Sequence, residues 1–485
     1  MRHSRIFFAV LAIVAFVTTA GAYFPGPLVL TSGPSPFAGC TVGGPGTNYV
    51  NAEVEPFIAV NPTDSQNIVG VVQQDRWSNG GAHGLTTMVS HNGGATWSET
   101  FAHFSFCSGG TVANGGDFDR ASDPWVSFGP DGTAYQISLS ASADLLTSAI
   151  LVSRSLDGGD TWSEPATLIR ETSAFNFNDK ESITADPNTA GNVYAVWDRS
   201  RIPSDTANLS ALNSFAFRGD IMFSRTTDGG LTWSAARAIY HPRSLDFTIA
   251  NQITVLPDGT LVDTFTNFHG SGVNSPGIFV ELIRSTDLGL TWSSPIIVDH
   301  LRAVSVVDPD TGFPLRTGDI IPDVGVAPAS GKLYLVWQDS RFSGGAHADI
   351  AYTESSDGGF TWSPTVKINQ TTNDAAAFTA SVAVAADGTV GVSYYDMRNN
   401  TSDPGVPTDY WFVHCHSSCT NSANWSESHL SGPFDMETAP ISRGYFTGDY
   451  EGLAASGNNF LAFFVATNSG NTTNRTDVFF TSVGP

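Results

Sequence analysis

Acid–arginine pairs recur at four similar places in the sequence, and a planar guanidinium binds a carboxylate with two parallel hydrogen bonds. They are Asp75-Arg76, Asp198-Arg199-Ser200-Arg201, Asp339-Ser340-Arg341 and Asp396-Met397-Arg398. Two interpretations stay open. Each aspartate could pair with its own arginine and fix a loop, or the arginines could together bind an anionic ligand.

A second set consists of acids that precede short apolar segments. It comprises Glu53, Glu55, Asp117, Asp119, Asp123, Asp179, Glu181, Asp319, Asp323, Asp449 and Glu451. If these carboxylates converge, their mutual repulsion raises some pKa values and creates acid/base groups. They could equally bind Ca²⁺, which takes several carboxylate oxygens, or simply be solvated loop acids.

The segment Tyr445-Phe446-Thr447-Gly448-Asp449-Tyr450-Glu451 places tyrosine beside glutamate. A tyrosine next to a carboxylate can act as an activated nucleophile. Alternatively, Tyr450 packs between structural elements and Asp449 caps a turn.

A motif that ends in tryptophan positions these residues by recurring along the chain. It reads Ser155-Leu156-Asp157-Gly158-Gly159-Asp160-Thr161-Trp162 in one copy, and the tryptophans of the five clear copies are 59–71 residues apart. The Asp oxygens can accept backbone N–H groups in a hairpin turn, the glycines take positive φ, and the tryptophan covers the turn.

Each repeat also carries apolar strands around a second turn, which gives four strands per roughly 65 residues, the pattern of one propeller blade. We therefore predict an all-β fold: a single β-propeller over residues 23–485 with seven four-stranded blades, or six as the alternative. The last unit has three strands, so residues 26–31 are predicted to supply its fourth and close the ring.

The repeated motif resembles the Asp boxes, or BNR repeats, of the sialidase (neuraminidase) superfamily. Sialidases use arginines to hold the substrate carboxylate, a Tyr–Glu pair as nucleophile, and an aspartate as acid/base, outside the usual two-carboxylate scheme. The resemblance implies sugar-binding roles for Arg76, Arg201, Arg341 and Arg398. It also implies that Tyr450 or Tyr445, with Glu451 or Glu181, is the nucleophile pair and that Asp123 is the acid/base.

Two functions follow as hypotheses. One is a secreted sialidase-like glycoside hydrolase that cleaves terminal sugars from glycans, with no cofactor required although Ca²⁺ could bind. The other is a non-catalytic propeller that binds glycan or protein at the cell surface.

The charge balance excludes some partners. The chain holds 46 Asp and Glu against 22 Lys and Arg, a net charge of −24. Such a surface repels phosphate backbones and anionic lipids, so we expect no nucleic-acid or membrane partner. We expect a monomer that meets a glycan or polysaccharide.

The N-terminus predicts export. Arg2 and Arg5 precede an apolar run and then Ala20-Gly21-Ala22, which is typical of a signal peptide over residues 1–22.

The four cysteines of an exported protein favour disulfides. We favour Cys40–Cys107 and Cys415–Cys419, although Cys415 and Cys419 could instead bind a metal with His414 and His416. The predicted location is extracellular, with the cell surface as an option.

Overall fold

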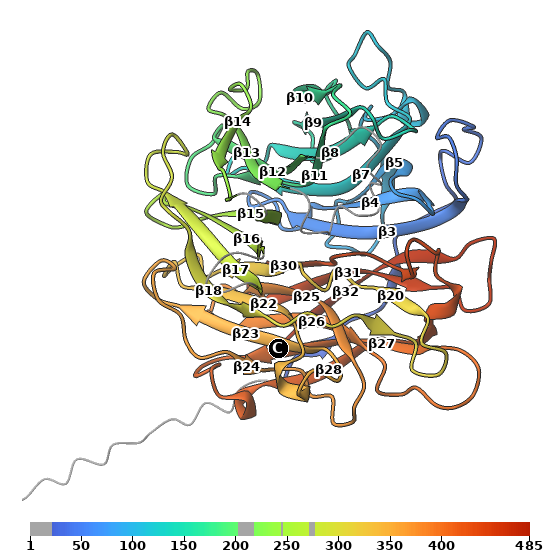
Figure 1. Cartoon of the computed structure of the whole chain (residues 1–485), viewed down its shortest axis with the longest axis vertical. Helices are drawn as coiled ribbons and strands as arrows, with labels where there is room; N and C mark the ends of the chain where they lie inside the picture. Colours follow the sequence, from blue (N-terminus) through green and yellow to red (C-terminus); the bar gives the residue numbers. More distant parts are fainter. Residues whose placement is uncertain (1–21, 202–217, 244–245, 271–276) are drawn as a thin grey trace, which may run out of the picture.

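The fold is all-β in the part of the chain that the computed structural model describes, residues 22–201, 218–243, 246–270 and 277–485 (Figure 1). Residues 1–21 of the predicted signal peptide lie outside this part. Among the described residues, no helix is long and apolar enough to cross a membrane.

Successive segments fold into four-stranded antiparallel groups in chain order. The first three groups are β3 (Asn48–Val60), β4 (Ile68–Trp77), β5 (Ala82–Ser90) and β6 (Ser98–Thr100); β7 (Arg120–Phe128), β8 (Ala134–Ala141), β9 (Ser148–Ser155) and β10 (Ala166–Glu171); and β11 (Asn176–Ala185), β12 (Val193–Arg201), β13 (Arg218–Thr226) and β14 (Arg237–Tyr240). The next three are β15 (Phe247–Val255), β16 (Leu261–His269), β17 (Gly277–Ser285) and β18 (Ile296–Leu301); β21 (Asp323–Val326), β22 (Leu333–Asp339), β23 (Asp349–Ser355) and β24 (Val366–Lys367); and β25 (Ala377–Val384), β26 (Val390–Asp396), β27 (Pro407–Cys415) and β28 (Ser426–Asp435).

The last group brings the two ends of the chain together. Strands β30 (Gly452–Ser456), β31 (Asn459–Thr467) and β32 (Thr476–Gly484) are antiparallel. The N-terminal strands β1 (Phe24–Pro25) and β2 (Val29–Leu30) pair with the free side of β32, with Phe24 opposite Gly484 and Val29 opposite Phe480. The N-terminal segment therefore covers a sheet edge that would otherwise be open.

A small sheet stands outside this pattern. It consists of β19 (Val306–Val307), β20 (Pro314–Arg316) and β29 (Tyr445–Phe446), and β20 runs parallel to β29 with Arg316 opposite Phe446. It joins the long connection between β18 and β21 to the segment that precedes β30. Two regions about 130 residues apart in sequence are thereby held side by side.

The repeated tryptophan motif forms the hairpin turns that its residue types predict. In the second copy the Asp157 carboxylate accepts hydrogen bonds from the Ser155 hydroxyl at 2.7 Å and the Thr161 backbone N–H at 2.9 Å. Gly158 and Gly159 have φ of 76° and 103°. These bonds replace strand pairing at the turn and fix the hairpin between the third and fourth strands of the groups that carry the motif.

Apolar side chains from neighbouring groups pack against each other between the sheets. One cluster joins Ile137 of β8, Trp197 of β12 and Phe268 of β16, all buried.

Disulfides link Cys40 to Cys107 and Cys415 to Cys419, the pairing favoured from the sequence, with Cα atoms 5.6 and 5.7 Å apart.

Candidate functional site

The first strands of successive groups share an irregularity that supplies the site. In β3, β7 and β11 the pairing register shifts, and the residue at the start of each shift has positive φ: Glu55 (55°), Asp123 (50°) and Lys180 (49°). A β-bulge re-aims a side chain, and positive φ is strained for residues other than glycine. The three charged residues therefore occupy the same position in three consecutive groups. We call them the bulge residues.

Lys180 joins these acids into one buried cluster. Its Nζ lies 3.0 Å from Glu55 Oε1, 2.6 Å from Asp123 Oδ1 and 2.8 Å from Asp449 Oδ2. Glu55 and Asp449 are buried, and the Lys180 side chain is only 10% exposed. One ammonium thus bridges carboxylates from three separate segments, an arrangement in which each charge compensates the burial of the others.

Arginines lie beside this cluster. The Arg316 Nε donates to Asp449 Oδ1 at 2.8 Å, and its second ion-pair contact is to Asp449 Oδ2. Arg76 Nη2 and Arg316 Nη1 lie 3.2 and 3.5 Å from the same Ser442 hydroxyl, and both guanidiniums stack over the Phe446 ring. Two cationic groups are therefore held close together by one serine and one aromatic ring.

Arg443 follows Ser442 directly and is exposed. Within the described part of the chain it has neither an ion pair nor a hydrogen bond from its side chain, while the charge of neighbouring Arg316 lowers its pKa. An unpaired guanidinium next to two others is a position ready to receive an anion.

These groups line one cavity of about 780 Å³, a volume suited to a small-molecule ligand. Its charged lining consists of Glu55, Arg76, Arg120, Asp123, Asp144, Asp179, Lys180, Arg316, Asp319, Arg443 and Asp449. Five of these eleven groups are cationic although the whole chain is strongly acidic. The site is thus far less negative than the protein around it.

Burial raises the pKa of several of the cavity acids. Burial first, and then the charge of Asp123, raises the pKa of Asp179 to about 6. Burial and the Asp449 charge raise the pKa of Asp319 to about 6, and burial raises that of Glu55 to about 7 although Lys180 opposes the shift. Asp179 and Asp319 are also partly exposed, so each can exchange a proton with a ligand near neutral pH.

Asp449 behaves in the opposite way. Its burial alone would raise the pKa, but the charges of Arg316 and Lys180 outweigh burial and hold the pKa of Asp449 well below its usual range. Asp449 is therefore an ionised anchor for two cations.

The four arginines with implied sugar-binding roles do not meet. Arg76 lines the cavity, whereas Arg341 pairs with Asp299 and Asp339 at 2.6 and 2.8 Å and Arg398 pairs with Asp396 and Glu427 at 2.6 and 2.5 Å. Arg201 is exposed and lies 3.4 Å from Asp220. Three of the four are thus held by local acids away from the cavity.

The predicted tyrosines lie beside the cavity. The Tyr450 hydroxyl donates to the Pro124 carbonyl at 3.2 Å, its ring packs on Trp125, and Lys180 Nζ lies 5.5 Å from the ring centroid. Tyr445 lies in β29 and packs on Phe313. Neither is among the described residues that line the cavity.

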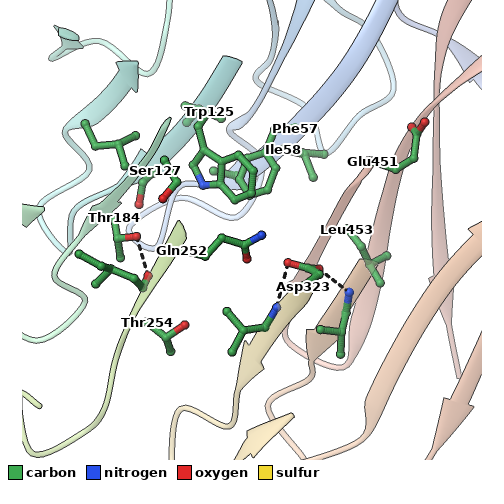
Figure 2. A pocket seen from close by; sticks show the side chains of 17 residues that line it. Phe57, Ile58, Trp125, Ser127, Thr184, Gln252, Thr254, Asp323, Glu451 and Leu453 are labelled. Atoms are coloured by element: carbon green, nitrogen blue, oxygen red, sulfur yellow. Dashed lines mark hydrogen bonds between the residues drawn. The ribbon is translucent and has the colours of Figure 1, made fainter. Parts of the chain in front are cut away.

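The two predicted glutamate partners are buried elsewhere. Glu181 is buried with no hydrogen-bond partner for either carboxyl oxygen among the described residues. Glu451 accepts a hydrogen bond from the Val465 N–H and lies at the edge of a second, smaller cavity of about 270 Å³ (Figure 2). Asp323 lines the same cavity and is held by the backbone N–H groups of Val324 and Val382.

The acids predicted to precede apolar strands in part lie inside them, since Glu53 belongs to β3 and Glu181 to β11. Those that do not line a cavity have local roles. Glu53 is buried against the Gln74 amide at 2.6 Å. Asp117 pairs with Arg170, and Asp119 accepts from the Ala143 N–H. Of the predicted site residues, Arg76 and Asp123 line the large cavity, and four further acids of the second set, Glu55, Asp179, Asp319 and Asp449, line it as well.

Sequence reasoning missed Lys180, Arg316 and Arg443. The sequence did hold a signal for Arg316, which directly precedes one of two Thr-Gly-Asp segments, at 317–319 and at 447–449. Both segments end in an acid that lines the cavity. Lys180 lies between Asp179 and Glu181, and the sequence interpretation considered only these two carboxylates.

The structure offers no metal centre within the described ranges, where no three His, Cys, Asp or Glu side chains are placed to hold an ion. Among Glu55, Asp123 and Asp449 the central position is taken by the Lys180 ammonium. At the predicted His–Cys site, Cys415 and Cys419 are joined in a disulfide.

The resemblance to the sialidase superfamily is confirmed by a curated relative, although no family model matches the chain. The relative is a sialidase of Bacteroides fragilis (strain YCH46), 30% identical over 201 residues, which covers 37% of this chain and 34% of that protein. The chain thus spans about a third of the length of the curated relative.

Solved structures are similar over most of the chain at low identity. A Dyadobacter fermentans protein of unknown function is 13% identical, with 95% of this chain and 99% of that one covered and a TM-score of 0.49. An α-L-arabinanase of Penicillium chrysogenum in complex with arabinobiose is 13% identical, with 94% and 98% covered and a TM-score of 0.48. The Hadza microbial sialidase Hz136 is 16% identical, with 87% and 74% covered and a TM-score of 0.48.

Proposed function

We propose that the protein is a glycoside hydrolase that removes a terminal acidic sugar from a glycan. The observation that carries this proposal is one cavity in which Arg76, Arg316 and Arg443 lie beside partly exposed acids with a raised pKa. The similarity to a curated sialidase supports the same class of activity.

The chemistry follows from the protonation states. The sugar carboxylate binds the guanidiniums of Arg316 and Arg443, which leaves the glycosidic bond among the acids. Asp179, protonated below about pH 6, donates its proton to the glycosidic oxygen as the bond to the anomeric carbon breaks. Asp123, ion-paired with Lys180, is a carboxylate that stabilises the positive charge on the sugar.

Water completes the reaction. Its oxygen bonds to the anomeric carbon and its proton passes to a carboxylate, so that the products are the free acidic sugar and the shortened glycan. Because the Tyr450 hydroxyl donates to the Pro124 carbonyl outside the cavity, this scheme uses carboxylates and leaves tyrosine out of the covalent chemistry.

We further propose that residues 23–485 form a single seven-bladed propeller, with a secreted location. The consecutive four-stranded groups and the pairing of β1 and β2 with β32 support the ring. Two disulfides and the signal-like N-terminus support secretion.

The test is hydrolysis of a panel of aryl glycosides with acidic and neutral terminal sugars, N-acetylneuraminic acid included. We expect turnover of an acidic glycoside, with kcat/KM falling as pH rises above about 6 because Asp179 loses its proton. Asp179→Asn should abolish that turnover, because an amide cannot donate the proton.

Arg443→Gln should lower kcat/KM for the acidic glycoside about 10- to 150-fold, the equivalent of one charge-assisted hydrogen bond of about 1.5–3 kcal/mol. Arg341→Gln is the matched control, since Arg341 is tied to Asp299 and Asp339 outside the cavity. Equal effects of the two variants, or turnover of neutral glycosides alone, would overturn the proposal. Binding without turnover would favour a non-catalytic glycan-binding module.

A further inference from the structure

Part of the large cavity is lined by a continuous apolar surface, which we call the apolar wall. Its members are Leu139, Leu145, Phe177, Ile249, Ile320 and Ile321. The first, third and fourth are buried, and the others are partly buried and pack against the same cluster. The wall is therefore one contiguous surface, built from β8, the β8–β9 turn, β11, β15 and the segment after β20.

The cationic groups come from different elements. Arg76 belongs to β4, Arg316 to β20, and Arg443 to the segment before β29, and all three are linked through Ser442 and Phe446 or adjacent to them. None of them belongs to the apolar cluster. One cavity thus presents an anion-binding surface and an apolar surface to the same ligand.

The apolar wall keeps surface available to a ligand. Leu145, Ile320 and Ile321 are only partly buried, and the adjacent Leu146, which also lines the cavity, is 45% exposed. Apolar side chains that stay open in a concave site mark a place where binding removes them from water. A purely polar saccharide would leave this surface without a partner.

We propose that the substrate is an acidic sugar linked to an apolar aglycone, such as an alkyl or aryl group, with the aglycone seated on the apolar wall. This inference rests on the proposed function, because it takes the anionic sugar to be at the arginines. It adds a requirement at the other end of the molecule. The bond that breaks then lies between the two surfaces, in the cavity that Asp179 and Asp123 also line.

The experiment measures Kd for the methyl, butyl and octyl glycosides of N-acetylneuraminic acid by calorimetry, with octyl glucoside as the neutral comparison. It uses the Asp179→Asn variant, so that any turnover of these glycosides does not disturb the binding equilibrium. Each fully buried methylene tightens binding about fourfold, the equivalent of about 0.8 kcal/mol. With methylenes about half buried, we expect the butyl glycoside to bind roughly eightfold more tightly than the methyl glycoside. Octyl glucoside should bind weakly, since it lacks the anion.

Ile320→Ser and Leu146→Ser should weaken the dependence of Kd on chain length, so that the butyl and octyl glycosides lose more affinity than the methyl glycoside does. Leu156→Ser is the control, because Leu156 is 74% exposed on a hairpin turn away from the cavity. The same Kd for all three glycosides, or an unchanged chain-length dependence in both cavity variants, would overturn the inference.

The two proposals fail separately. Chain-length-dependent binding without hydrolysis of any glycoside would refute the hydrolase and retain the apolar subsite. Hydrolysis with no effect of chain length on Kd or KM would refute the subsite and retain the hydrolase.

Discussion

At the scale of the residue, Lys180 decides how the site is charged. Its ammonium contacts Glu55, Asp123 and Asp449 within 3.0 Å, and all of these groups are withdrawn from solvent. Without it, three carboxylates would converge with only Arg76 and Arg316 to balance them. Lys180 therefore lets acids gather in a buried place while Asp179, its neighbour in sequence, keeps a proton to give.

Lys180→Met tests this role. We expect a destabilisation of about 3–5 kcal/mol near pH 7.5, the cost of leaving partners of a buried ion pair uncompensated. The loss should shrink near pH 4.5, because the freed carboxyls become protonated. Thermal unfolding at both pH values measures the difference.

Lys332→Met provides the comparison. Lys332 pairs with Glu354 at 2.7 Å but is 32% exposed, so its removal should cost about 1 kcal/mol or less. A Lys180→Met variant as mildly affected as this one, with no dependence on pH, would contradict the role of Lys180.

At the scale of the element, the small sheet of β19, β20 and β29 brings Arg316 to the site. Its approach is close: a Cβ at Gly318 would lie 2.0 Å from the Asp449 carbonyl oxygen, and Gly318 has φ of 63°. Only glycine allows the two Thr-Gly-Asp segments to lie this near each other. The contact sets the distance over which Arg316 reaches Asp449.

Gly318→Ala should therefore separate the segments and weaken the Arg316–Asp449 pair. We expect at least about a tenfold loss of affinity for an anionic glycoside, together with lower stability. Gly312→Ala is the matched control, because Gly312 also has positive φ (73°) but nothing within 4 Å of the added Cβ. It should lose stability through backbone strain alone and keep the affinity, and equal affinities in the two variants would refute the argument.

The periodicity of the sequence predicts most of the strands and hairpins, but it does not predict the segments that lie outside the repeat. The tryptophan motif locates the hairpins because its Asp, Gly and Thr residues make local bonds that need no tertiary partner. The sheet of β19, β20 and β29 depends on pairing between segments about 130 residues apart, and the repeated Thr-Gly-Asp is its one trace in the sequence that the structure explains, far from any hairpin motif. Arg316 and Arg443 were missed for this reason.

The repeated acid–arginine pairs led to the opposite error, because a structural contact was interpreted as a ligand-binding one. Arg341 and Arg398 recur with the repeat because each forms an ion pair with an aspartate of its own strand group. Their repetition therefore reflects a structural role. The acids of the second set were better guides, since Asp123, Asp179 and Asp449 all line the cavity. Asp123 and Asp179 lie inside β7 and β11 rather than before them, so the strand itself fixes their position, whereas the contacts of a long arginine side chain depend on its neighbours.

At the scale of the whole molecule, buried carboxyls shape the response to pH. Burial raises the pKa of Glu53, Glu181, Asp198, Asp263 and Glu451 well above the ordinary value. Burial also raises the pKa of Asp323 to about 6. The folded protein then holds more protons than the unfolded chain between about pH 4 and these raised values.

Stability should consequently fall as pH rises from about 5 to 8. Asp449 acts in the other direction, since its lowered pKa gives stability that is lost below about pH 4. We expect the highest Tm near pH 4–5, measured by calorimetry across pH 3.5–8. A Tm that climbs steadily from pH 5 to pH 7.5 would contradict this linkage.

Glu181→Gln isolates one contribution, because glutamine has the shape of the protonated acid and cannot ionise. It should raise Tm by a few degrees at pH 7.5 and leave it unchanged at pH 4.5. Glu164→Gln, at an exposed position, should change neither value appreciably.

The bulges in the first strands carry a consequence for redesign. Ala250 of β15 and Thr379 of β25 have the same positive φ (66° and 51°) at the same register shift as Glu55, Asp123 and Lys180. The backbone deviation is thus shared by members with apolar, hydroxyl, acidic and basic side chains. The bulge therefore does not dictate which side chain it carries. Ala250 and Thr379 neither line the large cavity nor belong to the Lys180 cluster, so they are the members of this set where the side chain can be changed without removing a partner of that cluster.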